Sequence, residues 1–294
     1  MNPRPDLRPH IINNSYACPE HEECSKTAFN AAVKVLRASG ILMIASAGNS
    51  GPKCGTINAP PAIEPLVFTV GATDANDKLA SFSARGPAIY AGGQILRKPA
   101  VVAPGVQILG AFMTSGYKRI SGTSMAAPLV TGAAALISKR CRTSRMHNNL
   151  LVSSCPCLER SIERVERLLE ESAVKMYPSS ELKSKDGAYC GSDTEASVPN
   201  NYYGHGRIDV LKAVQQCREM CAELAHKYPR QRPGLEQAVP EEAVMPEPNI
   251  FESSAVGDND ESMRILADDA ERKSALKVAE GATSTASALY IIKK

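Results

Sequence analysis

The sequence predicts an α/β fold in which a mostly parallel β-sheet is flanked by helices. The first observation is the apolar run over residues 41–45, which follows a segment of helical periodicity. Such a run is typical of a parallel strand that is buried on both faces. The second is the segment 124–138, which is apolar or small on every side. A helix of that kind must be buried, here against the predicted sheet.

The elements before the buried helix follow from local patterns. A helix is predicted over residues 27–38, because its alanines, Val35 and Leu36 recur at helical spacing and Gly40 ends it. Further short strands are predicted over residues 66–70 and 100–103. The strands lead into loops rich in Gly and Pro, which is where open α/β sheets hold their sites.

After the buried helix the chain is predicted to be more polar. Residues 141–157 have the composition of an exposed insertion. Residues 161–173 form an amphipathic helix with aliphatic residues on one face and glutamates and arginines on the other. This charge pattern indicates a solvated face rather than a binding site. Residues 183–201 are polar and loop-like, and residues 209–223 form the last helix.

The composition changes beyond Tyr228. Residues 233–263 hold eight acidic side chains, several prolines and no Lys or Arg, which is typical of a disordered segment. We therefore expect one α/β domain over residues 1–225, followed by an acidic, Pro-rich and disordered tail over residues 226–294.

The overall composition excludes several classes of protein. The 294 residues carry 34 basic and 31 acidic side chains, a net charge of +3 without a basic block, so we expect no nucleic-acid partner. No apolar run approaches the roughly 20 residues of a membrane span. Residues 1–8 are polar and Pro-rich, unlike a signal peptide. Nothing visible directs the chain to secretion, unless Met1 is an internal residue of a longer precursor.

Nine cysteines are a high and odd number for this chain. They suit an oxidising compartment, their connectivity stays open, and at least one thiol must stay unpaired within the chain. The spacing Cys18-x-x-His21-x-x-Cys24 invites comparison with a metal site. No second ligand pair completes a tetrahedron, so we expect no metal there.

The segment 122–128, with the sequence Gly-Thr-Ser-Met-Ala-Ala-Pro, places one serine hydroxyl at the start of the buried helix. Backbone N–H groups at a helix N-terminus lack intrahelical partners and attract negative charge. A serine held there can attack a carbonyl while N–H groups face the oxygen that becomes charged. A lone Gly-Thr-Ser would indicate only a helix cap. The whole segment, with the apolar helix behind it, favours a nucleophile.

This segment resembles the nucleophile motif of the subtilisin-like serine proteases, the subtilases. A second match is the segment 44–52, Ile-Ala-Ser-Ala-Gly-Asn-Ser-Gly-Pro, which resembles the family segment whose asparagine donates to the tetrahedral oxyanion. Further matches follow in family order at residues 65–72, 80–87, 102–106 and 204–210. The resemblance runs from about Ile11 to about Val214 and implies a three-layer, subtilisin-like fold.

The resemblance implies a serine endopeptidase that cleaves polypeptides through an acyl-enzyme at Ser124. The side chain of Asn49 would be one donor to the oxyanion, and the N–H of Ser124 would be the other. The alternative role of Asn49 is that of a turn residue. That role explains the loop but not the paired match with the Ser124 motif.

The resemblance also implies a peptide-binding cleft formed by three short segments. The first matches the family segment that pairs with an extended peptide by strand addition, although plain strand packing stays open for it. The second would line the primary specificity pocket, where small residues leave room for a large apolar side chain. The third surrounds the nucleophile. The predicted substrate-binding residues are Ser15, Tyr16 and Ala17, then Ser46, Ala47 and Gly48, then Gly122 and Thr123.

Two parts of the family's catalytic triad are not found in this sequence. Subtilases carry Asp, His and Ser in that order, but here only 10 residues precede the strand expected at 11–14. No Asp-Ser/Thr-Gly or His-Gly-Thr segment occurs, and none of the 5 histidines stands in a suitable pattern. A serine without a base is a weak nucleophile, so we expect this chain to be nearly inactive alone.

Three interpretations stay open. The chain is the C-terminal half of an endopeptidase whose missing N-terminal segment carries the Asp and His. Alternatively, it is a non-catalytic pseudoprotease or peptide-binding fragment, or one half of a split enzyme that another chain completes. In this chain alone, without the strands that carry the Asp and His, we expect the strand at 11–14 to form an apolar, exposed sheet edge.

Two further expectations rest on the family alone. Subtilases often bind calcium, but this sequence places no ligands for it and implies no other cofactor. The family and the cysteines indicate secretion or an endomembrane location for a full-length parent, whereas the location of this chain stays unknown.

Overall fold

The computed structural model describes residues 8–18, 26–112, 116–141, 144–147, 150–153 and 161–227. The tail expected over residues 226–294 lies outside these ranges except for its first two residues, and His21 and Cys24 also lie outside them. No helix in the described part of the chain combines the length and the apolar character that a membrane span requires.

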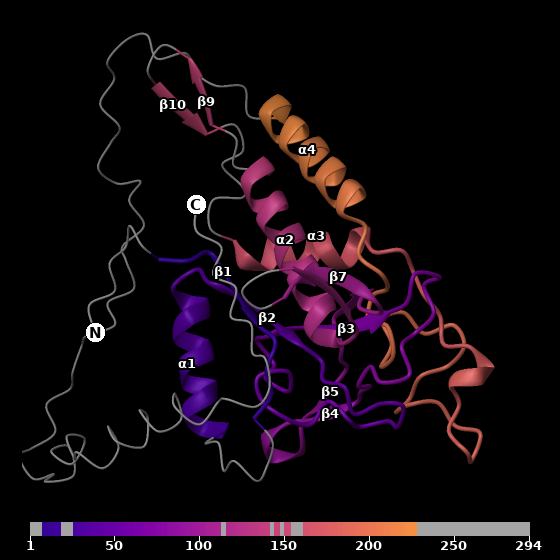
Figure 1. Cartoon of the computed structure of the whole chain (residues 1–294). Coiled ribbons are helices and arrows are strands. Elements are labelled where there is room, and N and C mark those ends of the chain that lie inside the picture. Colours follow the sequence, from indigo (N-terminus) through magenta and orange to yellow (C-terminus); the bar gives the residue numbers. More distant parts are fainter. Residues whose placement is uncertain are drawn as a thin grey trace, which may run out of the picture. The chain divides into compact units, whose positions relative to one another are not determined.

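The centre of the fold is a four-stranded parallel sheet in the order β1-β2-β3-β6 (Figure 1). Its strands are β1 (Ile11–Asn14), β2 (Leu42–Ser46), β3 (Phe68–Thr73) and β6 (Val101–Pro104). The predicted α/β class with a mostly parallel sheet is therefore confirmed. The strands expected at 41–45, 66–70 and 100–103 are β2, β3 and β6, each displaced by a few residues.

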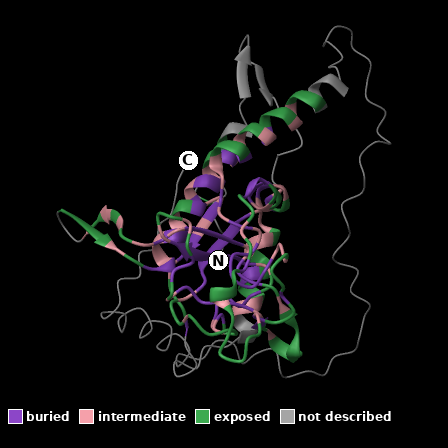
Figure 2. Ribbon diagram, turned by 90° about the vertical axis from the view of Figure 1, so that its right-hand side faces the viewer, coloured by how far each residue is buried: buried purple, intermediate pink, exposed green. Residues whose placement is uncertain are grey.

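Helices cover both faces of this sheet, which gives three layers. Along β2, Leu42 and Ile44 pack in one cluster with α2 (Thr123–Cys141), α3 (Ile162–Ser172) and α4 (Val210–Lys227). The alternate residues Met43 and Ala45 pack against Val33 of α1 (Lys26–Ala38) on the other face. Successive side chains of a strand point to opposite faces, so β2 divides the two layers. Figure 2 shows the buried residues gathered around the sheet.

The predicted helices correspond closely to those observed. The apolar segment 124–138 is α2, which contacts the sheet through Ala126, Val130, Ala133 and Ile137, all nearly inaccessible. Small side chains let this helix approach the strands closely. Its first turn therefore lies at the sheet, where the predicted nucleophile is placed.

Three antiparallel hairpins were not predicted. They pair β4 (Ala88–Ile89) with β5 (Ile95–Leu96), β7 (Ile108–Ala111) with β8 (Tyr117–Ile120), and β9 (Ser144–His147) with β10 (Leu150–Ser153). Two short 3₁₀ turns, Ala91–Gly93 and Ser180–Leu182, complete the secondary structure. The third hairpin occupies much of the insertion expected at residues 141–157. Leu109 and Tyr117 are exposed, so β7 and β8 lack the buried alternating pattern that a sequence reveals.

The expected exposure of β1 is corrected by the structure. The strand lies at the edge of the described sheet, but Ile11, Asn13 and Asn14 are buried. The two asparagines are also polar and hydrogen-bonded: the Thr131 hydroxyl of α2 donates to Asn13 Oδ1 at 3.1 Å, and Asn14 Nδ2 donates to the Ile44 carbonyl at 3.2 Å. The edge is thus tied to its neighbours through polar side chains.

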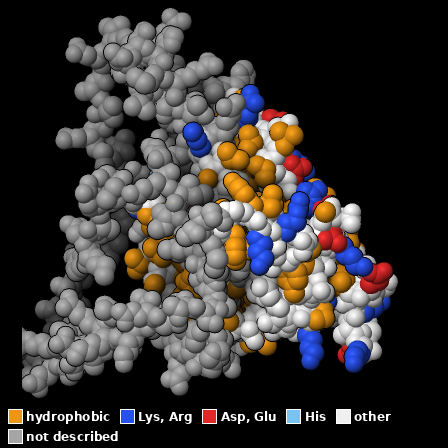
Figure 3. Space-filling model, viewed as in Figure 1, with side chains coloured by type: hydrophobic (Ala, Val, Ile, Leu, Met, Phe, Trp, Pro, Cys, Tyr) orange, Lys and Arg blue, Asp and Glu red, His pale blue; other side chains and the backbone are white. Residues whose placement is uncertain are grey.

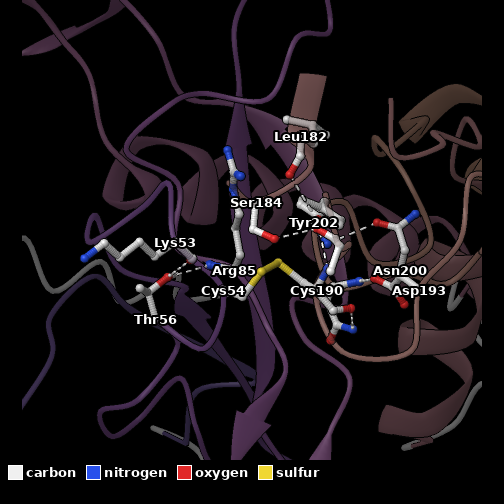
Figure 4. The surroundings of a disulfide bond; sticks show 12 residues. Lys53, Cys54, Thr56, Arg85, Leu182, Ser184, Cys190, Asp193, Asn200 and Tyr202 are labelled. Atoms are coloured by element: carbon white, nitrogen blue, oxygen red, sulfur yellow. Dashed lines mark hydrogen bonds between the residues drawn. A yellow bond between two sulfur atoms is a disulfide. The ribbon is translucent and has the colours of Figure 1, made fainter. Parts of the chain in front are cut away.

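A disulfide joins two distant segments of the domain. Cys54, in the loop after β2, is bonded to Cys190 across a sequence separation of 136 residues (Figure 4). Around it, the Tyr202 hydroxyl accepts from the Cys190 N–H at 2.8 Å, and Arg85 lies over the Tyr202 ring. Cys18, Cys217 and Cys221 are disulfide-bonded as well.

Charged side chains are mixed on the visible surface. On the face drawn in Figure 3, Lys and Arg side chains are scattered among acidic and apolar ones. This distribution agrees with the balanced composition.

Candidate active site

Three loops meet at the carboxyl ends of the parallel strands. β1 leads into Ser15, β2 leads into residues 47–49, and β6 leads into Gly105, whose carbonyl accepts a hydrogen bond from the Gly122 N–H at 2.8 Å. A Cβ on Gly105 would lie 2.7 Å from Ala72 Cβ and 2.8 Å from the Gly122 carbonyl oxygen. Because no side chain fits there, glycine allows the loop before α2 to lie against the end of β6.

Asn49 is fixed to the N-terminus of α2. Its side-chain oxygen accepts from the Thr123 N–H and from the Thr123 hydroxyl, both at 3.0 Å. A backbone N–H can only donate, so the atom that faces it must be the oxygen, and the amide nitrogen points elsewhere. The Thr123 hydroxyl also accepts from the Gly48 N–H at 3.1 Å. Thr123 therefore joins the predicted oxyanion loop to the predicted nucleophile helix.

The amide nitrogen of Asn49 and the backbone nitrogen of Ser124 both lie beside Gly122. A Cβ built on Gly122 would lie 3.5 Å from Asn49 Nδ2 and 3.7 Å from the backbone nitrogen of Ser124. Both donors thus lie within 4 Å of one point in space. Two N–H groups that share a small region can stabilise one anionic oxygen.

Ser124 is half-buried and contacts β1. Its hydroxyl donates to the Ser15 carbonyl at a long 3.4 Å, and the Ser15 hydroxyl donates to the Ser124 carbonyl at 3.1 Å. Asn13 Nδ2 donates to the Ser15 hydroxyl at 2.9 Å, and Asn13 in turn accepts from Thr131. Within the described residues, the Ser124 hydroxyl hydrogen-bonds to no imidazole or carboxylate.

The other predicted substrate-binding residues lie around this point. Tyr16 and Ala17 are exposed after the end of β1, and partial burial raises the pKa of the Tyr16 hydroxyl. Ser46 and Ala47 are buried at the end of β2, and Gly48 has the left-handed φ of 103°. The structure brings these positions to the carboxyl ends of the parallel strands. Their roles toward a substrate stay predictions.

A separate group of ionisable residues lies near the amino ends of β3 and β6, at the opposite end of the strands from Ser124. A pocket of about 230 Å³ is lined by residues next to the starts of β3 and β6 together with Glu166, Glu170 and His205. Burial, followed by the charges of Glu166 and Glu171, raises the pKa of Glu170 to about 7. Burial lowers the pKa of His205, whose Nε2 lies 3.9 Å from Glu170 Oε2. His205 is therefore not placed to act on Ser124.

The local sequence patterns did not reveal the contacts of two residues, Thr123 and Lys98. Thr123 was predicted only to bind substrate, whereas its hydroxyl holds Asn49 in place. Lys98, which is buried beside the pocket and contacts the loop behind Ala47, was not singled out. A lysine directly before an apolar strand was the only signal for it. No cluster of His, Cys, Asp and Glu that could hold a metal ion occurs among the described residues.

Comparison with known proteins identifies the relatives of this arrangement. Bacillopeptidase F of Bacillus subtilis is 34% identical over 221 residues, covering 72% of this chain and 13% of the relative. Subtilisin-like protease SBT6.1 of Arabidopsis thaliana is 31% identical over 208 residues, covering 70% of this chain and 17% of the relative. The chain thus spans less than a fifth of the length of these two relatives.

A solved structure and a family model extend this comparison. The protease domain of PatA, in a variant form, superposes with a TM-score of 0.50 and 27% identity over 72% of this chain and 60% of that domain. The model of the subtilase family matches residues 4–206, which is more than half of the chain. The chain therefore belongs to the subtilase family.

Proposed function

We propose that this chain carries the nucleophile and the oxyanion donors of a serine endopeptidase. The observation that carries the proposal is the position of Asn49 Nδ2 and the Ser124 backbone nitrogen, both beside Gly122, with the Asn49 oxygen already bound by Thr123. Donors that are fixed before the reaction need no reorganisation as charge develops. Membership of the subtilase family supports the same activity.

In the proposed mechanism, a polypeptide lies extended beside the segment that follows β1. Main-chain hydrogen bonds to residues 15–17 hold it by strand addition. The Ser124 hydroxyl gives its proton to a general base and attacks the scissile carbonyl, while Asn49 and the Ser124 N–H stabilise the tetrahedral oxyanion. The C–N bond then breaks, the amine product leaves with that proton, and the acyl-enzyme remains. A water molecule, deprotonated by the same base, attacks the ester, and the acid product leaves as the proton returns to Ser124.

We further propose that the general base and its aspartate come from a segment outside this sequence. The hydroxyl of Ser124 donates to the Ser15 carbonyl, and a carbonyl cannot take the proton in catalysis. In subtilisin, a relative of this chain, losing the serine or the base costs on the order of 10⁶ in kcat, a value carried over here. The chain alone should therefore turn over extremely slowly.

The same hydroxyl geometry favours a second candidate. A serine bonded to a backbone carbonyl, with the predicted peptide-binding segment beside it, also suits a non-catalytic, peptide-binding pseudoprotease. The two functions differ in one property. Only a protein that also holds the base will activate Ser124.

An activity-based probe separates the two functions. We would express the chain alone and together with the segment encoded directly upstream of Met1, and treat both with a fluorophosphonate. For the endopeptidase we expect labelling and casein cleavage in the longer protein, both abolished by Ser124→Ala. Asn49→Ala should lower the rate about 10²- to 10³-fold, the range measured for the asparagine donor of subtilisin.

Ser50→Ala is the matched control, since Ser50 is an exposed serine next to Asn49 and should keep full labelling. Casein cleavage at the parent rate by Ser124→Ala would show that the nucleophile is another residue. A longer protein that binds peptide but never takes the label would favour the pseudoprotease.

A further inference from the structure

Lys98 is a buried lysine whose amine lies among protein oxygens. It is only 6% exposed and directly precedes Pro99 and β6. Its Nζ donates to the carbonyls of Glu64 at 2.8 Å and Val67 at 2.9 Å, and to the hydroxyl of Thr69 at 2.8 Å. Three close oxygens around one nitrogen match the three N–H donors of an ammonium group.

The hydroxyl of Thr69 indicates which form of the amine is present. It donates to the Ala62 carbonyl at 2.8 Å, so it must accept from Lys98. All three neighbours of the nitrogen are then acceptors, and the lone pair of a neutral amine would face one of them. Burial lowers the pKa of Lys98 to about 7, while Glu64 and Glu166 act to raise it. The hydrogen-bond arrangement favours the charged form.

A buried carboxylate accompanies this cation. The side chain of Glu64 is fully inaccessible, and its Oε2 accepts from Asn30 Nδ2 at 3.0 Å. Its Oε1 is buried without a hydrogen-bond partner among the described residues. A buried carboxylate of this kind is costly without a nearby positive charge. Lys98 supplies that charge from the separate segment that precedes β6, and Glu64 in turn acts to raise the pKa of Lys98.

Two of the three oxygens around Lys98, the carbonyls of Glu64 and Val67, belong to the loop that lies behind the predicted specificity pocket, and the third is the hydroxyl of Thr69 in β3. This loop, residues 59–67, turns through hydrogen bonds from the Glu64 N–H to Pro61 and from the Val67 N–H to Glu64. Its Ala62 and Ile63 pack in one cluster with Ala47. The position of this loop therefore sets the position of Ala47, which is predicted to line the primary specificity pocket.

We propose that Lys98 is a positioning residue whose ammonium group acts as an internal cation and fixes the loop over residues 59–67 against Ala47. Carbonyl and hydroxyl oxygens are also the ligands that surround K⁺ in proteins. A variant that loses the ammonium should leave an oxygen-lined space that accepts K⁺. The inference goes beyond the proposed catalytic function and does not require turnover.

Amide hydrogen exchange of the full chain tests this proposal. In Lys98→Met the aliphatic stem is kept and the charge is lost, so exchange at the Glu64 and Val67 amides should accelerate at least about tenfold. In Lys98→Ala the same acceleration should be reversed by KCl but not by tetramethylammonium chloride at equal ionic strength. Lys78→Met is the control, because Lys78 is exposed and should show neither effect.

Two results would overturn the proposal. One is protection in Lys98→Met equal to that of the parent chain. The other is equal exchange of Lys98→Ala in both salts, which would contradict the role of the ammonium group as an internal cation. If the lysine variants do not fold, Thr69→Val and Thr69→Ser replace them. The proposal requires faster loop exchange in the valine variant and parental exchange in the serine variant.

Discussion

At the scale of single residues, the candidate site depends on a side chain that holds the predicted oxyanion donor in place. Thr123 bonds the Asn49 oxygen through both its N–H and its hydroxyl, and it also accepts from Gly48. These contacts fix the Asn49 carboxamide through its oxygen and leave Nδ2 beside Gly122. The orientation of the predicted oxyanion donor is thus a property of the helix start rather than of the asparagine alone.

Thr123→Val should therefore weaken catalysis without removing any catalytic group. The variant keeps the N–H contact and the side-chain shape but loses the hydroxyl, so the carboxamide is held by one bond instead of two. We expect kcat to fall about tenfold to a hundredfold, since small misplacements cost up to 10². KM should change little, because the donor acts mainly on the transition state. Steady-state peptidase kinetics of the active longer protein measure both constants.

Thr123→Ser provides the control, because it restores the hydroxyl and should keep most of the parent kcat. A valine variant as fast as the parent would mean that the backbone contact alone orients Asn49. A change confined to KM would instead assign Thr123 to substrate binding, the role that the sequence suggested.

The residues of the site were predictable to different degrees. Ser124 and Asn49 stand in local motifs, because the chemistry needs a tight turn and a helix start around them. The contributions of Thr123 and Lys98 depend on contacts with residues far away in the chain, 74 positions for Thr123 with Asn49 and 34 for Lys98 with Glu64. No local pattern records such contacts, so they become visible only in the fold.

At the scale of elements, α3 carries an ionisable group whose protonation is linked to folding. Glu170 has its pKa raised to about 7, first by burial and then by Glu166 and Glu171, from an ordinary value of 4.5. The folded chain therefore binds more protons than the unfolded chain between these two values. The resulting stability is fully present below pH 4.5 and is lost as the pH rises through about 7.

Glu170→Gln should remove this loss. We expect the variant to resemble the parent near pH 5 and to be more stable at pH 8, because it has no carboxylate to ionise inside the pocket. The free energy of unfolding in urea, measured from pH 5 to pH 8, gives the comparison. The neighbour His205 acts in the opposite direction, since burial lowers its pKa and its contribution is lost as the pH falls.

Glu219→Gln, on the exposed surface of α4, is the matched control and should leave the pH profile unchanged. If Glu170→Gln follows the parent profile at every pH, the carboxylate ionises in the pocket without a cost to folding.

The helices and strands were predictable where burial of one or two faces imposes a regular spacing of apolar residues. The helices α1, α2 and α3 and the strands of the sheet have one or two buried faces, and their apolar spacing records this. The hairpins β4–β5 and β7–β8 have short strands with exposed side chains such as Ile89, Ile95 and Leu109. Their pairing arises from backbone hydrogen bonds, which leave little trace in side-chain type.

At the scale of the whole molecule, the sheet order shows how the active-site loops are brought together. β1, β2 and β6 come from separate parts of the chain, and their parallel arrangement places all three carboxyl ends at one edge. The sequence predicted parallel strands but not their order, because order depends on which helix crosses which face. The family resemblance implied the three layers, and the order of the strands became visible only in the structure.

The disulfide between Cys54 and Cys190 should contribute strongly to the stability of this arrangement. It closes a loop of 136 residues that contains β3, β6 and all of α2. A cross-link over such a distance restricts the unfolded chain, and losing a native disulfide costs about 2–5 kcal/mol. We expect the double variant Cys54→Ala/Cys190→Ala to lose unfolding free energy in that range, as measured by urea denaturation under oxidising conditions.

Lys53→Ala, an exposed neighbour of Cys54, should lose less than about 0.5 kcal/mol. A double variant as stable as this control would mean that hydrogen bonds around Tyr202, rather than the covalent link, hold the two segments together.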